Sequence, residues 1–327
     1  MKKSITLLLS ILIGGTLLVG CNQTKEEPVV EIKNVKVIAP DGLPAIYLAK
    51  LAKEDPEVMK GYKIEYSIEA TSVSLSTTVM KQEPDIAVVP SNMAAMAYNK
   101  TSNYQILGTV GMGSFYLVSS EDINDFDDLL GKEVGNTGKG LTPDITVQTI
   151  LKEKNINTKD VNFNYVNAMS ELVPLMATGK LNTGFVAEPA LTGLMIKNEN
   201  IKIIKGLNDA WKEISDSKTG YPQSTLIIKS DFARENPEFV KSFTEEISNG
   251  IKWLNENSKD AGIYAKEFGV STEPTVIEKA MERANLEFVR ISEMQKEYDD
   301  YYQKLFDFEP KTVGGKLPDE GIFYKGE

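Results

Sequence analysis

The chain has 327 residues and a formal net charge of −11; it contains no histidine, and its single cysteine is Cys21. The acidic balance argues against nucleic acid as a partner and against electrostatic binding to anionic lipid. Histidine is the usual general base near neutral pH and, with cysteine, the usual transition-metal ligand, so the composition disfavours catalytic residues, a metal site and a resident cofactor. The length exceeds one ordinary single-core domain and predicts two lobes.

The first 21 residues have the pattern of a secretory signal peptide. Lys2 and Lys3 precede an apolar run from Ile5 to Leu18, and Val19-Gly20-Cys21 follows. This ending resembles the lipobox of bacterial lipoproteins, which implies that Cys21 is acylated and becomes the new N-terminus. The alternative is a membrane-spanning anchor, but the run is shorter than the ~20 apolar residues of a span. We therefore expect a signal at 1–21, a tether at 22–32, and a lipid-anchored protein on the outer side of the cell membrane or in the periplasm.

From Val35 onward, short apolar segments alternate with amphipathic ones, which is typical of a mostly parallel sheet covered by helices on both faces. The first cycle of this α/β pattern predicts strands at 35–39, 63–68, 85–89, 105–110 and 115–119, and helices at 43–52, 72–81 and 91–99. The second cycle predicts strands at 133–136, 162–166, 183–187, 201–205 and 224–229, with helices at 125–130, 142–154, 170–178 and from 188 onward.

The C-terminal third is predicted to be helical. Phe239, Phe243, Ile247, Ile251 and Leu254 recur at helical spacing within 237–255, and two further helices are expected up to about residue 306. The tail from residue 310 is rich in Gly and Pro and is expected to pack back over one lobe.

The carboxyl ends of the strands are the predicted ligand site, because helix N-termini point their free N–H groups there in open α/β sheets. In the first cycle the candidates are Asp41, Gly42, Leu43, Ser72, Val73, Ser91 and Asn92, and in the second they are Thr137, Gly138, Lys139, Gly140, Thr142, Met169 and Glu188. Nearby aromatic candidates are Tyr47, Phe115 and Tyr221, with the two tyrosines as stacking groups. Ser91, Asn92 and Thr142 equally suit a role as caps of their own helices.

The charged residues near these junctions bear on the ligand. Asp41 and Glu188 suit a cationic or hydrogen-donating ligand if they face the cleft, while a capping or solvent role is the alternative for each. All three arginines, including Arg283, fall in predicted C-terminal helices away from the junctions, which disfavours a fork-like clamp on a carboxylate or sulfonate. Lys139 and the helix N-termini can still hold an anion.

Several segments between about residues 34 and 325 together resemble one protein family. They are Gly42-Leu43-Pro44-Ala45, Asp85–Asn92, Leu129–Val134, Thr137–Gly140 with Thr142-Pro143, and Ala187–Ala190. In this order they resemble the substrate-binding lipoproteins of the nitrate/taurine/sulfonate (NMT1/THI5-like) branch of ABC importers. The resemblance implies a type II periplasmic-binding fold with a discontinuous lobe of residues 33–116 plus 226–327, an inserted lobe of residues 117–225, and a hinge between them.

The resemblance also implies a function. We expect a receptor, most simply a monomer, that captures a small organic molecule by lobe closure and delivers it to an ABC permease and its ATPase. A heterocycle, such as a thiamine precursor, is favoured over a sulfonate because the junctions carry aromatic and apolar residues. The alternatives are a solute-sensing lipoprotein without transport and a carboxylate-only enzyme on the same fold.

Overall fold

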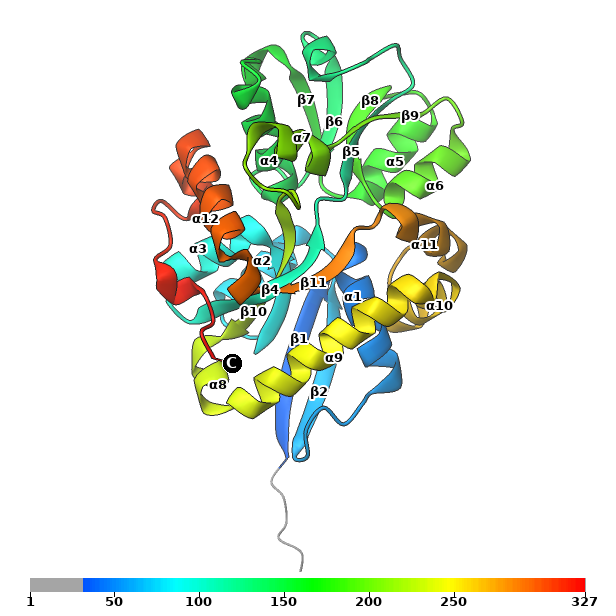
Figure 1. Cartoon of the computed structure of the whole chain (residues 1–327). Helices are drawn as coiled ribbons and strands as arrows, with labels where there is room; N and C mark the ends of the chain where they lie inside the picture. Colours follow the sequence, from blue (N-terminus) through cyan, green and yellow to red (C-terminus); the bar gives the residue numbers. More distant parts are fainter. Residues whose placement is uncertain (1–31, 327) are drawn as a thin grey trace, which may run out of the picture. The chain divides into compact units, whose positions relative to one another are not determined.

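The computed structural model describes residues 32–326 (Figure 1). The predicted signal peptide, the lipidation at Cys21 and nearly all of the tether lie outside the described residues. Within 32–326, none of the helices combines the length and the apolar character that crossing a membrane requires.

Two sheets organise these residues. The first has six strands in the order β11-β4-β10-β3-β1-β2. Its strands are β1 (Lys33–Pro40), β2 (Tyr62–Glu69), β3 (Ile86–Pro90), β4 (Tyr104–Met112), β10 (Pro222–Lys229) and β11 (Leu286–Arg290). Strand β1 runs parallel to β2 and β3, whereas β10 runs antiparallel to both β3 and β4. The first sheet therefore uses strands from both ends of the described chain.

The second sheet has five strands in the order β7-β6-β8-β5-β9. Its strands are β5 (Phe115–Ser119), β6 (Glu133–Thr137), β7 (Asn162–Val166), β8 (Thr183–Ala187) and β9 (Lys202–Gly206). Strand β6 runs parallel to β7 and β8, and β5 runs antiparallel to β8 and β9. The chain passes between the sheets after β4 and again before β10, which is the α/β arrangement that the sequence predicts.

Helices cover both faces of each sheet. They are α1 (Leu43–Glu54), α2 (Ser72–Met80), α3 (Ser91–Thr101), α4 (Thr142–Glu153), α5 (Met169–Ala177), α6 (Ala190–Lys197), α7 (Leu207–Ile214), α8 (Ser230–Glu235), α9 (Pro237–Glu256), α10 (Ser258–Phe268), α11 (Pro274–Ala280) and α12 (Ile291–Phe308). On β1, alternate side chains join different cores: Val35 and Val37 pack with α1 and α9, and Ile38 packs with α2 and α3. This two-residue alternation is what a strand buried on both faces requires.

The helical prediction for the C-terminal third was incomplete. Residues Leu286–Arg290 form strand β11, which pairs with β4 at the edge of the first sheet. A five-residue segment is too short for its periodicity to distinguish strand from helix. The tail does pack over the first sheet, because Phe323 forms a bridge with Ile106 of β4 and is buried.

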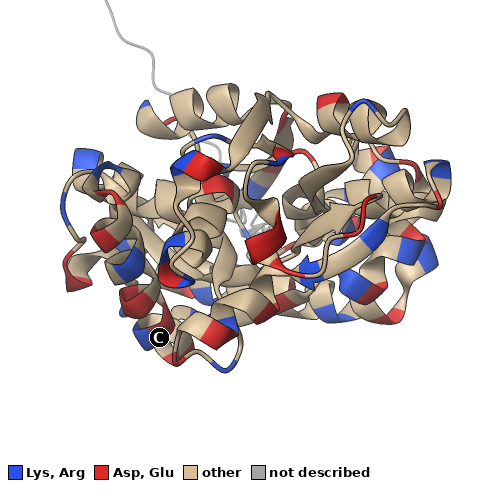
Figure 2. Ribbon diagram, turned by 90° about the horizontal axis from the view of Figure 1, so that it is seen from above, with Lys and Arg blue, Asp and Glu red and all other residues tan. Residues whose placement is uncertain are grey.

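Helices that pack on the first sheet also contact helices that pack on the second sheet. Helix α12 lies beside α4, and α11 lies beside α6 (Figure 1). Tyr301 of α12 packs edge-on against Trp211 of α7 with ring centroids 5.0 Å apart, and its hydroxyl is 2.9 Å from that of Thr146 in α4. Acidic and basic residues are interspersed over the ribbon as viewed in Figure 2, without a face of one sign in that view.

Candidate functional site

A cavity of about 340 Å³ is lined by residues from both sheets and their helices. The lining consists of Pro40, Asp41, Gly42, Leu43, Pro44, Glu69, Ala70, Thr71, Ser72, Pro90, Phe115, Thr137, Gly138, Leu141, Pro143, Asn167, Ala168, Met169, Ser170, Ala187, Glu188, Pro189, Ala190, Gln223, Ser224, Ser271 and Thr272. Most of these residues stand where a strand ends and a helix begins, as the topology predicts for a ligand site.

Two carboxylates lie on the first-sheet side of the cavity. The parallel register of β1 and β2 pairs Pro40 with Glu69, so Asp41 and Glu69 stand at neighbouring strand ends. One oxygen of Asp41 accepts hydrogen bonds from the main-chain N–H groups of Gly42 at 2.8 Å and Ser271 at 3.1 Å. Glu69 accepts one from the hydroxyl of Thr78 at 3.2 Å. Neither carboxylate forms an ion pair within residues 32–326, so both retain accepting capacity toward a ligand.

The second-sheet side of the cavity presents the first turns of α5 and α6. The residues before these helices, Ala168 and Pro189, supply no side-chain cap. The leading N–H groups of a helix have no partner within the helix, and they carry the positive end of its dipole. This side of the cavity therefore offers hydrogen-bond donors, opposite the acceptors of Asp41 and Glu69.

A buried pair, Asn92 and Thr142, joins α3 to the start of α4 beside the cavity. The Asn92 Oδ1 atom accepts hydrogen bonds from the Thr142 main-chain N–H at 2.9 Å and its hydroxyl at 3.1 Å. The Asn92 Nδ2 atom donates to the carbonyls of Gly140 at 3.2 Å and Thr312 at 3.0 Å. Asn92 thus caps a helix of the other sheet rather than its own.

Asp144 fixes the loop that follows β6. It accepts hydrogen bonds from the Tyr165 hydroxyl at 2.6 Å, from the Gln148 amide at 3.0 Å and from the main-chain N–H of Gly140 at 2.9 Å. Burial raises the pKa of Tyr165, and the neighbouring carboxylate raises it further. These contacts hold residues 137–140 at the cavity edge.

Glu188 forms an ion pair with Arg283, which the sequence placed away from the site. Arg283 Nε lies 2.7 Å from Glu188 Oε1, and Arg283 Nη2 donates to the Thr192 hydroxyl at 2.7 Å. The main-chain N–H of Thr192 donates to Glu188 Oε2 at 3.0 Å. The Glu188 side chain has 0% exposure, and this burial raises its pKa although Arg283 and Thr192 stabilise the carboxylate. Its charge is therefore already paired, unlike that of Asp41.

The two predicted stacking tyrosines are in the core. Tyr47 is 0% exposed and lies against Gly111, where an added Cβ would be 1.9 Å from its hydroxyl. Tyr221 is also 0% exposed and stacks on Tyr301 with ring centroids 5.9 Å apart. Burial raises the pKa of both hydroxyls. Phe115 is the one predicted aromatic residue that lines the cavity.

The cavity thus brings together part of the predicted set. Among the predicted residues, those that line it are Asp41, Gly42, Leu43, Ser72, Phe115, Thr137, Gly138, Met169 and Glu188. Those that do not are Tyr47, Val73, Ser91, Asn92, Lys139, Gly140, Thr142 and Tyr221. Val73 is 76% exposed, Ser91 is buried with its hydroxyl 2.6 Å from that of Thr225, and the Lys139 ammonium lies over the Tyr165 ring.

Several lining residues were not predicted. Glu69 follows directly on the predicted strand at 63–68 and ends β2, so the rule that ligands bind at strand ends could have found it. Gln223 and Ser224 belong to antiparallel β10, where the rule for parallel strands gives no signal. Ser271 and Thr272 precede α11 and reach the cavity only through tertiary packing. In residues 32–326, no group of acidic side chains is placed to hold a metal ion.

The geometry agrees with the comparisons to known proteins. Residues 58–261 match the family model described as NMT1/THI5 like. The chain belongs to the NMT1/THI5-like family. The predicted resemblance is thereby confirmed. No curated protein matches this NMT1/THI5-like chain.

Solved structures resemble this NMT1/THI5-like protein over most of its length. An ABC transporter protein from Parabacteroides distasonis is 23% identical, with a TM-score of 0.77 over 90% of this chain and 99% of that one. The periplasmic aliphatic sulphonate-binding protein of Escherichia coli is 14% identical, with a TM-score of 0.71 over 90% and 92%. A Candida albicans protein described as having the generic periplasmic binding protein fold is 18% identical, with a TM-score of 0.58 over 89% and 94%. The predicted periplasmic-binding fold is confirmed.

Proposed function

We propose that the protein is the substrate-binding receptor of an ABC importer and that it binds one small organic molecule in the cavity between the sheets. The family match and the ABC-transporter neighbours support this assignment. In this proposal a lipid on Cys21 holds a monomeric receptor outside the cytoplasm, and the receptor delivers its ligand unaltered to a permease driven by an ATPase. Residues 33–116 plus 226–327 and residues 117–225 act as two lobes that close when the ligand contacts both.

The arrangement of donors and acceptors in the cavity carries the ligand assignment. Asp41 and Glu69 accept hydrogen bonds on one side, and the leading main-chain N–H groups of α5 and α6 donate them on the other, except that of Thr192, which bonds to Glu188. Prolines, alanines, Leu43 and Phe115 add apolar surface to the cavity lining. This combination suits a flat molecule with a donor edge and an acceptor edge, such as an aminopyrimidine precursor of thiamine.

A sulfonate fits this cavity less well. The E. coli neighbour is described as binding aliphatic sulphonates. Among residues 32–326, the cavity lining here includes no lysine or arginine, while two unpaired carboxylates face it. An anion would have to approach those carboxylates without a cationic partner, which is unfavourable in a site shielded from water.

Native mass spectrometry tests the receptor assignment. We expect the gently purified protein to release a small, chemically unaltered molecule on unfolding. Turnover of the bound molecule would instead indicate an enzyme.

Thermal unfolding and calorimetry with 4-amino-5-hydroxymethyl-2-methylpyrimidine and with taurine then test the ligand class. We expect the pyrimidine alone to stabilise the protein, and Asp41→Asn and Glu69→Gln each to weaken its binding about 10-fold through loss of a charged acceptor. Asp231→Asn is the matched control, because Asp231 is an exposed acid on α8 outside the cavity. Stabilisation by taurine without the pyrimidine would contradict the proposed ligand class.

A further inference from the structure

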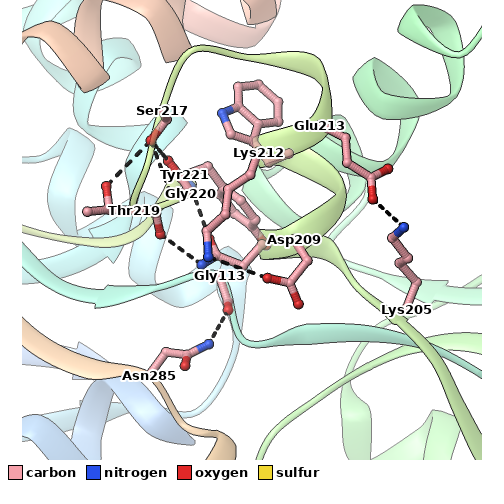
Figure 3. Close-up of polar contacts among 12 residues, drawn as sticks. Gly113, Lys205, Asp209, Lys212, Glu213, Ser217, Thr219, Gly220, Tyr221 and Asn285 are labelled. Atoms are coloured by element: carbon pink, nitrogen blue, oxygen red, sulfur yellow. Dashed lines mark hydrogen bonds and ion pairs between the residues drawn. The ribbon is translucent and has the colours of Figure 1, made fainter.

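The short segment of residues 283–285, which precedes β11, is bonded to the second sheet although it leads into the first. Besides the two Arg283 side-chain contacts, the Arg283 carbonyl accepts a hydrogen bond from the Tyr116 hydroxyl at 2.9 Å. The Asn285 Nδ2 atom donates to the Gly113 carbonyl at 2.7 Å (Figure 3). Gly113 lies where the chain passes between the sheets, and Tyr116 is in β5. The segment therefore connects the two sheets beside the passage between them.

The ion pair within this connection differs from the others. Among the ion pairs of residues 32–326, it alone has a carboxylate whose side chain is completely enclosed; Arg283 is 31% exposed. An enclosed carboxylate without a cationic partner is costly, so the ion pair favours the separation of the two sheets at which Arg283 reaches Glu188. Thr192 completes the arrangement, because its main-chain N–H and hydroxyl bind Glu188 while its hydroxyl accepts from Arg283.

The same contacts define one wall of the cavity. Glu188 lies between Ala187, the last residue of β8, and Pro189 and Ala190, which open α6; all four residues line the cavity. The residue is 2% exposed overall while its side chain is 0% exposed, so the Glu188 surface that remains accessible belongs to the main chain. Arg283 itself is not in the lining. Its contacts fix where the donors of the α6 first turn stand relative to Asp41 and Glu69.

We propose that Arg283 is a positioning residue for ligand binding: its bridge to Glu188 and Thr192 sets the α6 wall of the cavity at the separation from the first sheet that a bound ligand requires. The inference rests on the proposed receptor function, and it deepens it by naming a residue that governs affinity without touching the ligand. Without the bridge, the α6 wall of the cavity is no longer held at this separation, and the population of structures with the lobes apart increases. Part of the ligand's binding free energy is then spent on bringing the lobes together, which lowers the affinity.

Pulsed dipolar EPR measures the lobe separation without any ligand. The full chain carries Cys21→Ser, with nitroxide labels at Thr77→Cys on α2 and Lys180→Cys after α5, both exposed positions. We expect Arg283→Gln to lengthen and broaden the distance distribution. Arg283→Lys should restore part of it, because lysine can pair with Glu188 but cannot also reach Thr192 as the guanidinium fork does. Arg234→Gln is the matched control, since Arg234 is 68% exposed on α8 and pairs only with neighbouring acids.

Calorimetry with the same aminopyrimidine gives the second readout. We expect Arg283→Gln to weaken binding about 10-fold and Arg234→Gln to leave it unchanged. Glu188→Gln can still accept the bond from the Thr192 main-chain N–H through its single amide oxygen, and it leaves no buried carboxylate charge. We therefore expect it to remain folded even if Arg283→Gln does not, and to show the same lengthening.

Unchanged distances and unchanged affinity in folded Arg283→Gln and Glu188→Gln would overturn the proposal. If the wild type itself fails to bind the pyrimidine, the proposed ligand class is wrong. The EPR distance distributions alone then decide whether the Arg283 bridge sets the separation of the α6 wall from the first sheet.

Discussion

Replacement of Asn92 by alanine is expected to lower the free energy of unfolding by about 3 kcal/mol. Asn92 is 0% exposed, and its side chain is the partner of the Thr142 N–H and the Thr312 carbonyl, both in buried residues. Each buried polar group left without a partner costs about 1–3 kcal/mol, so the two together give about 3 kcal/mol. The Gly140 carbonyl adds little, because Gly140 is exposed and water can replace the amide there.

Urea unfolding followed by circular dichroism measures this loss by linear extrapolation. Asn99→Ala is the matched control: Asn99 is on the same helix, and its side-chain amide donates to the carbonyls of Val313 and Lys316 in the C-terminal tail, each at 2.7 Å. We expect this control to lose about 1 kcal/mol, because Lys316 is exposed. A loss in Asn92→Ala no larger than in Asn99→Ala, at unchanged m-value, would show that the connection between α3 and α4 does not stabilise the fold as argued.

Three further predictions concern single residues. Gly220→Ala should lower the unfolding free energy by about 1–3 kcal/mol in urea titrations. Gly220 has φ +102°, and an added Cβ would lie 1.8 Å from Asn208 Oδ1. Gly131→Ala is the control for the backbone contribution alone, because Gly131 has φ +71° and open space around an added Cβ. Tyr165→Phe should cost about 1 kcal/mol in the same assay by removing the bond to Asp144, and a neutral result would mean that Gln148 suffices. Burial raises the pKa of Glu188, so the native state binds more protons than the unfolded chain between the ordinary glutamate pKa and the raised one. The unfolding free energy of the wild type relative to Glu188→Gln should therefore fall as pH rises from the ordinary glutamate pKa through the raised one, and a difference independent of pH would exclude a raised pKa.

The sequence predicts the fold well because alternation of buried strands and amphipathic helices is a local signal. Phe115–Ser119, Asn162–Val166 and Thr183–Ala187 form strands with the predicted bounds. The α7 helix was not predicted; it is short and follows directly on strand β9. Strand β11 was missed for the same reason of length.

The candidate site is predicted only where local rules determine it. Asp41 and Ser72 stand at strand–helix junctions, and the topology alone brings such junctions to one edge. The Asn92–Thr142 pair spans 50 positions and the Arg283–Glu188 pair spans 95, and no local pattern encodes either contact. Tyr47 was predicted to stack on the ligand because it is close to the junction of β1 and α1, but it lies on the buried face of α1.

The position of β10 has a consequence for the order in which the molecule assembles during synthesis. All strands of the second sheet come from one uninterrupted stretch, residues 115–206, whereas β4 of the first sheet has β10 and β11 as its neighbours, both made later. A chain emerging from its N-terminus therefore holds β3 and β4 with unpaired edges until residue 229 is available, and such edges invite association between chains. We expect the second sheet to form first, with the first sheet closing around β10 as the slow, long-range step of folding.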